Sequence, residues 1–289
     1  MKLMFIHGRA QEGKDPTELR RSWEAALVNG MRAAGRPWPN GLEVVFPYYA
    51  DELQRLVLQA DAPLISNILA RGDDNVRPQE ALRASLLAEM AAGRELRDAD
   101  IRANFDGTLV QRDVQNWKWV QAILRTLDGT ATGQGLIDRV TRDVSVYLTY
   151  TGIRQHLDEM VASEIPAGKS VVVSHSLGTV IAYNILLKTP RDVAVPLHVT
   201  LGSPLGLKNV QAYLETPLSM PAATAHWFNA RDPQDVVALF PLDAQHFGIT
   251  PPIENWSTVQ NHTGNRHGIE GYLDDPEVAR RIWDALMAL

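Results

Sequence analysis

The sequence predicts an α/β protein with a mainly parallel sheet of about six strands and helices on both faces. Short apolar or β-branched runs alternate with helical stretches from the start of the chain. This alternation is typical of parallel sheets, because each parallel connection needs a crossover, usually a helix. A buried run that leads directly into a helix over residues 179–188 is the second observation. The expected strands are residues 3–6, 42–46, 169–173, 197–201, 225–229 and 253–259.

The first helix has both a start signal and an apolar face. Asp15 is expected to cap its N-terminus, Pro16 occupies the first helical position and Glu18 completes a capping box. Apolar side chains then recur every fourth residue, at Leu19, Trp23, Leu27 and Met31. This single stripe predicts a helix that buries one face. Asp275 followed by Pro276 predicts the start of a similar C-terminal helix.

The stretch over residues 51–135 differs from the rest of the chain, because β-branched runs nearly vanish and helical stripes dominate. One such stripe is Leu82, Leu86 and Met90. We therefore expect a helical cap over residues 51–135, inserted into a core formed by residues 1–50 and 136–289. Residues 144–165 are expected to form one long helix that leads back to the sheet.

Composition argues against several classes of partner. Of the 289 residues 45% are hydrophobic, so a substantial core can form. The net charge of −6 and the lack of a basic stripe argue against nucleic-acid binding and favour a small ligand. The absence of cysteine excludes disulfides and a thiolate zinc site. Without a signal-like start or a run of about 20 apolar residues, the chain is expected to be cytoplasmic and to have no membrane span.

The most specific motif is residues 174–178, which read Ser-His-Ser-Leu-Gly between the buried run and the helix that follows it. This order of strand, serine and helix is the signature of a nucleophile elbow, a sharp turn that presents a serine hydroxyl. A bulky side chain two residues from the serine would clash in such a turn, and Ser174 and Gly178 are both small. Ser176 is therefore the candidate nucleophile. The alternative is an ordinary serine that caps a core helix.

Other segments resemble those of the α/β-hydrolases, and among them lipases and esterases most. Besides the elbow they are His7 with Gly8, residues 202–204, residues 228–233 and residues 267–272. They are spread over nearly the whole chain except the helical stretch. Ser174 departs from the family's pattern, in which glycine is usual at that position. The resemblance implies the hydrolase fold and a catalytic triad in the chain order serine, acid, histidine.

A serine hydroxyl needs a base to accept its proton and a third group to orient that base. We expect His267 as the base, because it lies in a glycine-flanked loop before the last helix, where the family places its histidine; His262 is the alternative. Asp232 is expected as the acid, since it closely follows the strand at residues 225–229, as the family's acid does. Asp235 is the alternative acid, and Asp232 would also fit as the N-cap of a short helix.

Acyl transfer also needs two hydrogen-bond donors aimed at the developing oxyanion. The backbone N–H of Leu177, the first residue of the helix after the elbow, is the first candidate. The resemblance implies that the N–H of Arg9 is the second. Gly8 would let the chain pass close to the acyl oxygen, and His7 is expected to brace this loop.

Together these residues predict a carboxylic ester hydrolase that forms an acyl-enzyme intermediate, acts on a small-molecule ester and needs no cofactor. A thioesterase, a lipase proper and a non-catalytic binding module on the same scaffold are the alternatives. A metal site at His262 and His267 is disfavoured, because their spacing is not the helical i, i+4 and no glutamate lies between them. The acyl chain, the alcohol and the oligomeric state are left open.

Overall fold

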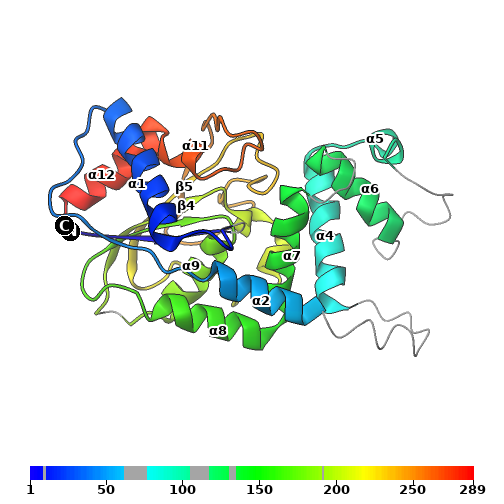
Figure 1. Ribbon diagram of the computed structural model, residues 1–289, viewed down its shortest axis with the longest axis horizontal. Coiled ribbons are helices and arrows are strands. Elements are labelled where there is room, and N and C mark those ends of the chain that lie inside the picture. The colour runs from blue at the N-terminus through cyan, green and yellow to red at the C-terminus, as the bar shows by residue number, and fades with distance from the viewer. Residues whose placement is uncertain (9–10, 62–76, 105–116, 130–134, 191) are drawn as a thin grey trace.

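The centre of the molecule is a six-stranded sheet in which every neighbouring pair of strands is parallel, in the order β2-β1-β3-β4-β5-β6 (Figure 1). The computed structural model describes residues 1–8, 11–61, 77–104, 117–129, 135–190 and 192–289. The strands are β1 (Lys2–Ile6), β2 (Glu43–Val45), β3 (Val171–His175), β4 (Val195–Leu201), β5 (Thr224–Ala230) and β6 (Glu254–Trp256). The predicted α/β class and parallel sheet of about six strands are confirmed.

Helices cover both faces of this sheet, and the side chains of β1 pack against both layers of helices. One face carries α1 (Pro16–Ala33), α11 (Glu270–Leu273) and α12 (Pro276–Met287); the other carries α8 (Thr151–Ala162) and α9 (Leu177–Lys188). Leu3 and Phe5 pack in the cluster with α1 and α12, whereas Met4 and Ile6 pack in the cluster with α8 and α9. Successive strand side chains point to opposite faces, and helices cover both faces. All four residues from Leu3 to Ile6 are therefore buried and apolar.

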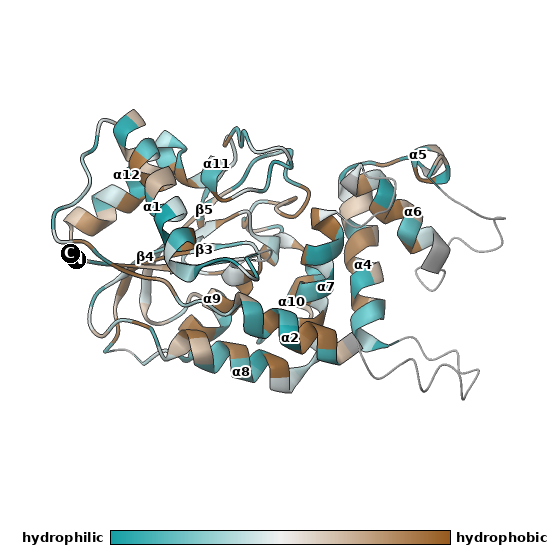
Figure 2. Cartoon of the chain, in the orientation of Figure 1, coloured by the Kyte–Doolittle hydropathy of each residue, from teal (hydrophilic) through white to brown (hydrophobic). Residues whose placement is uncertain are grey.

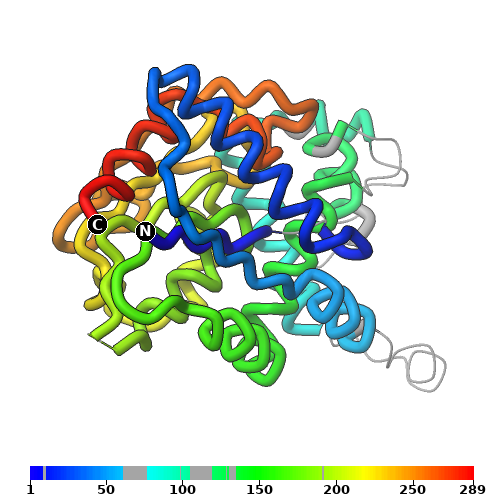
Figure 3. Tube along the Cα trace, turned by 60° about the vertical axis from the view of Figure 1, so that its left-hand side comes forward, coloured from blue at the N-terminus to red at the C-terminus, as the bar shows by residue number. Residues whose placement is uncertain are grey.

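The two terminal helices begin where the sequence predicts and lie side by side (Figure 3). The Asp15 carboxylate accepts hydrogen bonds from the first-turn N–H groups of Thr17 and Glu18, and Asp275 caps α12 in the same way. The four predicted stripe residues of α1, Leu19, Trp23, Leu27 and Met31, are buried. Capping and burial of one face therefore account for both helices.

All the described elements between residues 51 and 129 are helices. They are α2 (Ala50–Asp61), α4 (Pro78–Gly93), α5 (Asp98–Arg102) and α6 (Trp117–Asp128). Figure 1 shows α4, α5 and α6 at the end of the molecule away from the chain termini, beside α7 (Leu136–Thr149). Their apolar sides join the cluster that also contains α9, while polar residues occupy other positions on the same helices (Figure 2). Among the described residues, no helix has the length and apolar character to cross a membrane.

The expectation of one long helix over residues 144–165 is wrong. The chain forms two helices, α7 and α8, which are separated at Tyr150 with φ −97° and ψ 96°. The residues around the break are Thr149, Thr151 and Gly152. β-branched and glycine residues have low helix propensity, so the chain changes direction here at little cost.

Two short elements follow β4 and connect the sheet to the helical region. They are the 3₁₀ turn η1 (Pro204–Gly206) and the helix α10 (Lys208–Gln211). The Glu89 carboxylate on α4 accepts hydrogen bonds from the backbone N–H groups of Lys208 and Asn209, at 2.7 and 3.1 Å. This carboxylate satisfies the first N–H groups of α10 and holds α4 against α10.

The start of α9 packs directly on the backbone at the end of β1. A Cβ atom placed on Gly178 would lie 2.4 Å from the carbonyl oxygen of His7 and 2.5 Å from that of Ile6. Neither oxygen can move without disturbing the end of β1. The approach of α9 to β1 therefore requires glycine at this position.

We expect Gly178→Ala to lower the free energy of unfolding by about 1–3 kcal/mol or more, because the added methyl group overlaps two backbone carbonyls. Urea denaturation measures this change. Gly152→Ala is the matched control: no atom lies within 4 Å of the added Cβ, so this variant should gain about 0.4–1 kcal/mol. Equal stability of Gly178→Ala and wild type would contradict the proposed close contact.

Candidate active site

Ser176 occupies the sharp turn between β3 and α9. Its φ of 54° and ψ of −129° are rare for a residue with a side chain, and it is 1% exposed. Backbone hydrogen bonds hold the turn: the N–H of Ser176 donates to the carbonyl of Leu201 at 3.0 Å, and its own carbonyl accepts from the N–H of Thr179 at 2.9 Å. A strained serine between a buried strand and a helix N-terminus is the geometry expected of a nucleophile elbow.

Small residues surround Ser176, as such a turn requires. A Cβ atom on Gly8 would lie only 2.6 Å from the Cβ of Ser176. Ser174, where glycine was expected from the resemblance, also uses its hydroxyl: it donates to the carbonyl of Val199 and lies 3.1 Å from Nε2 of His198. Ser174 thus satisfies buried polar groups of the neighbouring strand in addition to leaving space.

His267 lies beside Ser176 although 91 residues separate them in the chain. Its Nε2 is 2.9 Å from Oγ of Ser176, and the imidazole is 3% exposed. The loop that carries it is fixed by the Asn265 carboxamide, whose oxygen accepts the backbone N–H of His267 at 3.0 Å. Gly202 has a φ of 58°, and a Cβ atom there would lie 3.1 Å from the imidazole. The predicted histidine is therefore within hydrogen-bond distance of the predicted nucleophile.

Asp235 is the carboxylate that contacts His267, with Nδ1 2.7 Å from Oδ2. The other carboxylate oxygen accepts the N–H groups of Val237 and Ala238, at 2.9 and 3.3 Å. Burial alone would raise the pKa of Asp235. The charge and hydrogen bond of His267, together with hydrogen bonds from Tyr272 and Val237, outweigh burial, so the net pKa lies below its ordinary value. This environment keeps the carboxylate ionised and fixes the proton of His267 on Nδ1.

Asp232, the expected acid, does not contact His267, and this expectation needs correction. Its Oδ1 accepts the N–H of Gln234 at 2.7 Å, and its Oδ2 accepts the N–H of Asn261 at 2.8 Å and lies 3.5 Å from the Arg266 guanidinium. The chain turns after β5, with the N–H of Asp235 bonded to the carbonyl of Asp232. This turn brings the second aspartate to the imidazole, while the first one anchors the loop that carries it.

Tyr272 is a site residue whose role the sequence did not reveal. Its fully buried hydroxyl donates to Oδ2 of Asp235 at 2.6 Å and accepts the N–H of Asp232 at 3.2 Å. Burial, together with the nearby Asp235 carboxylate, raises the pKa of Tyr272 well above its ordinary value, so the hydroxyl remains a donor. A buried tyrosine hydroxyl usually has a hydrogen-bond partner, so the sequence could predict that Tyr272 makes such a bond. It could not predict that the partner is Asp235.

The end of β1 lies next to the elbow, and His7, the residue expected to brace this loop, contacts Gly8 and Tyr49 there. Burial lowers the pKa of His7 to about 4, so its imidazole is neutral at neutral pH. Its Nδ1–H donates to the carbonyl of Gly8 at 2.8 Å, its Nε2 accepts the N–H of Tyr49 at 3.2 Å, and its carbonyl accepts the Tyr49 hydroxyl. The His7 and Tyr49 rings stack with centroids 4.0 Å apart.

Of the two expected oxyanion donors, one falls within the described part of the chain. Leu177 is buried, follows Ser176 directly and begins α9. Its N–H is one of the helix-start groups that have no partner within the helix. Arg9, the expected second donor, lies outside the described residues.

The remaining histidines near the elbow have other partners. His175 donates from Nε2 to the carbonyl of His267 at 2.8 Å, and burial lowers its pKa to about 3. His262, the alternative base, is paired with Asp274 at 2.6 Å and lies 63% exposed, so the structure does not bring it to Ser176. Within the described ranges, no three histidine, aspartate or glutamate side chains are arranged to hold a metal ion.

No protein-family model matches this chain, and its comparison with curated proteins and with solved structures gave no match either.

Three buried neutral histidines make stability depend on pH. Burial lowers the pKa of His7 from 6.5 to about 4, and those of His175 and His198 to about 3. Below pH 6.5 these histidines bind protons in the unfolded chain but stay neutral in the folded chain, so acid favours unfolding. Each histidine contributes about 1.4 kcal/mol per pH unit between its two pKa values, and this stability is fully present above pH 6.5.

We expect the free energy of unfolding, measured by urea denaturation, to fall steeply between pH 6.5 and pH 4. In His198→Gln the slope should decrease by about 1.4 kcal/mol per pH unit, because one titrating group is lost. An unchanged slope in His198→Gln would show that His198 does not refuse the proton.

Proposed function

We propose that the chain is a serine hydrolase that cleaves carboxylic esters through an acyl-enzyme intermediate, on an α/β-hydrolase fold. The observation that carries the proposal is the hydrogen-bonded series of Ser176, His267 and Asp235, with distances of 2.9 and 2.7 Å. These residues follow one another along the chain in the order serine, acid, histidine, which the elbow motif requires in this fold. In this proposal the helices within residues 51–135 cap the site.

The first half of the reaction uses the serine and the imidazole. Oγ of Ser176 attacks the acyl carbon while its proton passes to Nε2 of His267. The imidazolium that forms is paired with the Asp235 carboxylate, which stays ionised because its pKa is lowered. The imidazolium then donates its proton to the oxygen of the leaving alcohol, and the ester bond breaks.

The second half regenerates the enzyme. Water attacks the acyl-enzyme, its proton passes to Nε2 of His267, and the same proton returns to Oγ of Ser176 as the carboxylic acid leaves. In both halves negative charge develops on the acyl oxygen. We assign its stabilisation to the N–H of Leu177, at the positive end of α9, and to the N–H of Arg9. Each such donor typically contributes about 3–4 kcal/mol to lowering the barrier.

A series of p-nitrophenyl esters of increasing acyl length, together with labelling by a fluorophosphonate probe, tests this function. Wild type should show burst kinetics and be labelled at Ser176. Ser176→Ala should lose labelling and fall in kcat by about 10⁶-fold, and His267→Ala should fall comparably. Full turnover by Ser176→Ala would refute the mechanism.

The two aspartates supply a matched pair within the same experiment. Asp235→Asn should lower kcat by about 10⁴-fold, because an amide cannot stabilise the imidazolium or fix its tautomer. Asp232→Asn changes a carboxylate that is equally buried but bonded to the loop backbone, and should cost less than about tenfold. The reverse order of effects would assign the acid to Asp232.

Tyr272→Phe tests whether this hydroxyl positions and stabilises the Asp235 carboxylate. Removal of one charge-assisted hydrogen bond, worth about 1.5–3 kcal/mol, should lower kcat about tenfold or more and leave KM near wild type. The Asp235–His267 pair then binds a proton more tightly, so the acid limb of kcat/KM moves to higher pH. A lower kcat with an unmoved pH profile would indicate a purely structural role.

A further inference from the structure

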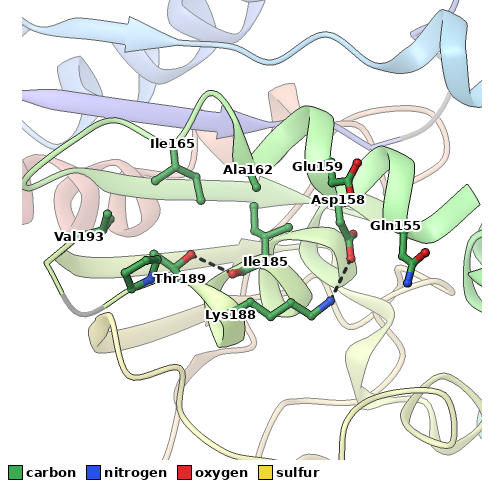
Figure 4. A pocket seen from close by; sticks show the side chains of 10 residues that line it. Gln155, Asp158, Glu159, Ala162, Ile165, Ile185, Lys188, Thr189 and Val193 are labelled. Atoms are coloured by element: carbon green, nitrogen blue, oxygen red, sulfur yellow. Dashed lines mark hydrogen bonds and ion pairs between the residues drawn. The ribbon is translucent and has the colours of Figure 1, made fainter. Parts of the chain in front are cut away.

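A groove remote from Ser176 lies between α8, the end of α9 and the segment that leads to β4 (Figure 4). Its volume is about 520 Å³. Lys188, on its wall, is the last residue of α9, whereas Ser176 precedes the first. At 1.5 Å per residue these ends of the helix are roughly 18 Å apart. The groove is therefore separate from the candidate active site.

Asp158 is the distinctive group of this groove. The residue is 6% exposed, and its Oδ1 accepts the hydroxyl of Tyr147 at 2.5 Å, which in turn accepts the amide of Asn184 at 2.8 Å. The second oxygen, Oδ2, has no hydrogen-bond partner in the described part of the chain. It points toward Nζ of Lys188, a residue that lines the groove, 3.8 Å away (Figure 4). A buried carboxylate oxygen without a hydrogen-bond donor is costly, so a donor placed at Oδ2 would be stabilising.

Lys188 satisfies Asp158 only in part. Its side chain is 65% exposed, and 3.8 Å exceeds hydrogen-bond distance. Because the lysine is exposed and the two charged atoms are not in hydrogen-bond contact, this pair contributes little, and the lysine can be displaced at small cost. Burial raises the pKa of Asp158, and the hydrogen bond from Tyr147 and the charges of Lys188 and Arg154 offset this effect only in part. A cation bound directly to Oδ2 would offset it further.

The residues that line the groove indicate which kind of cation would fit. Ile165, Ile185 and Val193 supply apolar surface in the same groove as Asp158. The exposed carboxylate of Glu159 and the carboxyl end of α9, which carries a partial negative charge, add to the negative potential. A charged head with a short aliphatic chain fits both features.

We propose that this groove binds a primary aliphatic ammonium ion, whose head group donates a hydrogen bond to Oδ2 of Asp158 in place of Lys188 and whose chain lies on Ile165 and Ile185. Binding of this kind is independent of the proposed hydrolase reaction.

Titration calorimetry with n-hexylamine at pH 7.5 and low salt tests the proposal, with n-hexanol as the uncharged comparison. Wild type should bind one hexylammonium ion saturably and bind hexanol at least tenfold more weakly. Asp158→Asn should weaken hexylammonium binding at least tenfold. Because asparagine keeps the oxygen that accepts the Tyr147 hydroxyl, the fold should persist, which circular dichroism checks.

Two further variants make the result decisive. Lys188→Met removes the competing cation and should tighten binding about threefold or more, whereas Glu18→Gln, on the opposite face of the sheet, should leave it unchanged. Absence of saturable binding by wild type, undiminished binding by Asp158→Asn, or weaker binding by Lys188→Met would each overturn the proposal. Repeating the titration after fluorophosphonate treatment shows whether any amine binds beside Ser176 instead.

Discussion

The position of Ser176 depends on how closely the end of β1 approaches the turn between β3 and α9. Two glycines make this approach possible: Gly178 faces the last carbonyls of β1, and Gly8 faces the serine itself. With side chains at either position the helix would retreat, and the strained φ of the serine would relax. His267, and through it Asp235, reach Ser176 from loops that are distant in the sequence, so these contacts depend on the turn being held in place.

The loops that meet at the turn are joined by two carboxylates with different partners. Asp235 accepts four hydrogen bonds and contacts the imidazole; Asp232 binds the backbone of the loop that delivers the imidazole. Tyr272 links the two, because its hydroxyl donates to one aspartate and accepts the backbone N–H of the other. The geometry of His267 is thus determined by one buried polar network in which each member restrains the next.

Local patterns were sufficient for the sheet, the helix caps and the residues at the turn, because each is determined by neighbours in the sequence. The strand-serine-helix order predicts Ser176, whereas His267 was expected from the resemblance of its glycine-flanked loop to that of the α/β-hydrolases. Local patterns could not decide between Asp232 and Asp235, because both accept N–H groups of the same turn. They differ in the contacts that Asp235 makes with His267 and Tyr272, which lie 32 and 37 residues farther along the chain. The break at Tyr150 likewise depended on packing that apolar periodicity does not describe.

The contact between His7 and Tyr49 joins two parts of the chain that the linear sequence keeps apart. Tyr49 immediately precedes α2, the first helix of the helical region, and it holds His7 through its N–H, its hydroxyl and its ring. His7 in turn holds the carbonyl of Gly8, which abuts Ser176. Residues 7 and 8 are therefore linked to the residue that precedes α2, so a rotation of α2 about its first turn would displace the peptide beside the serine.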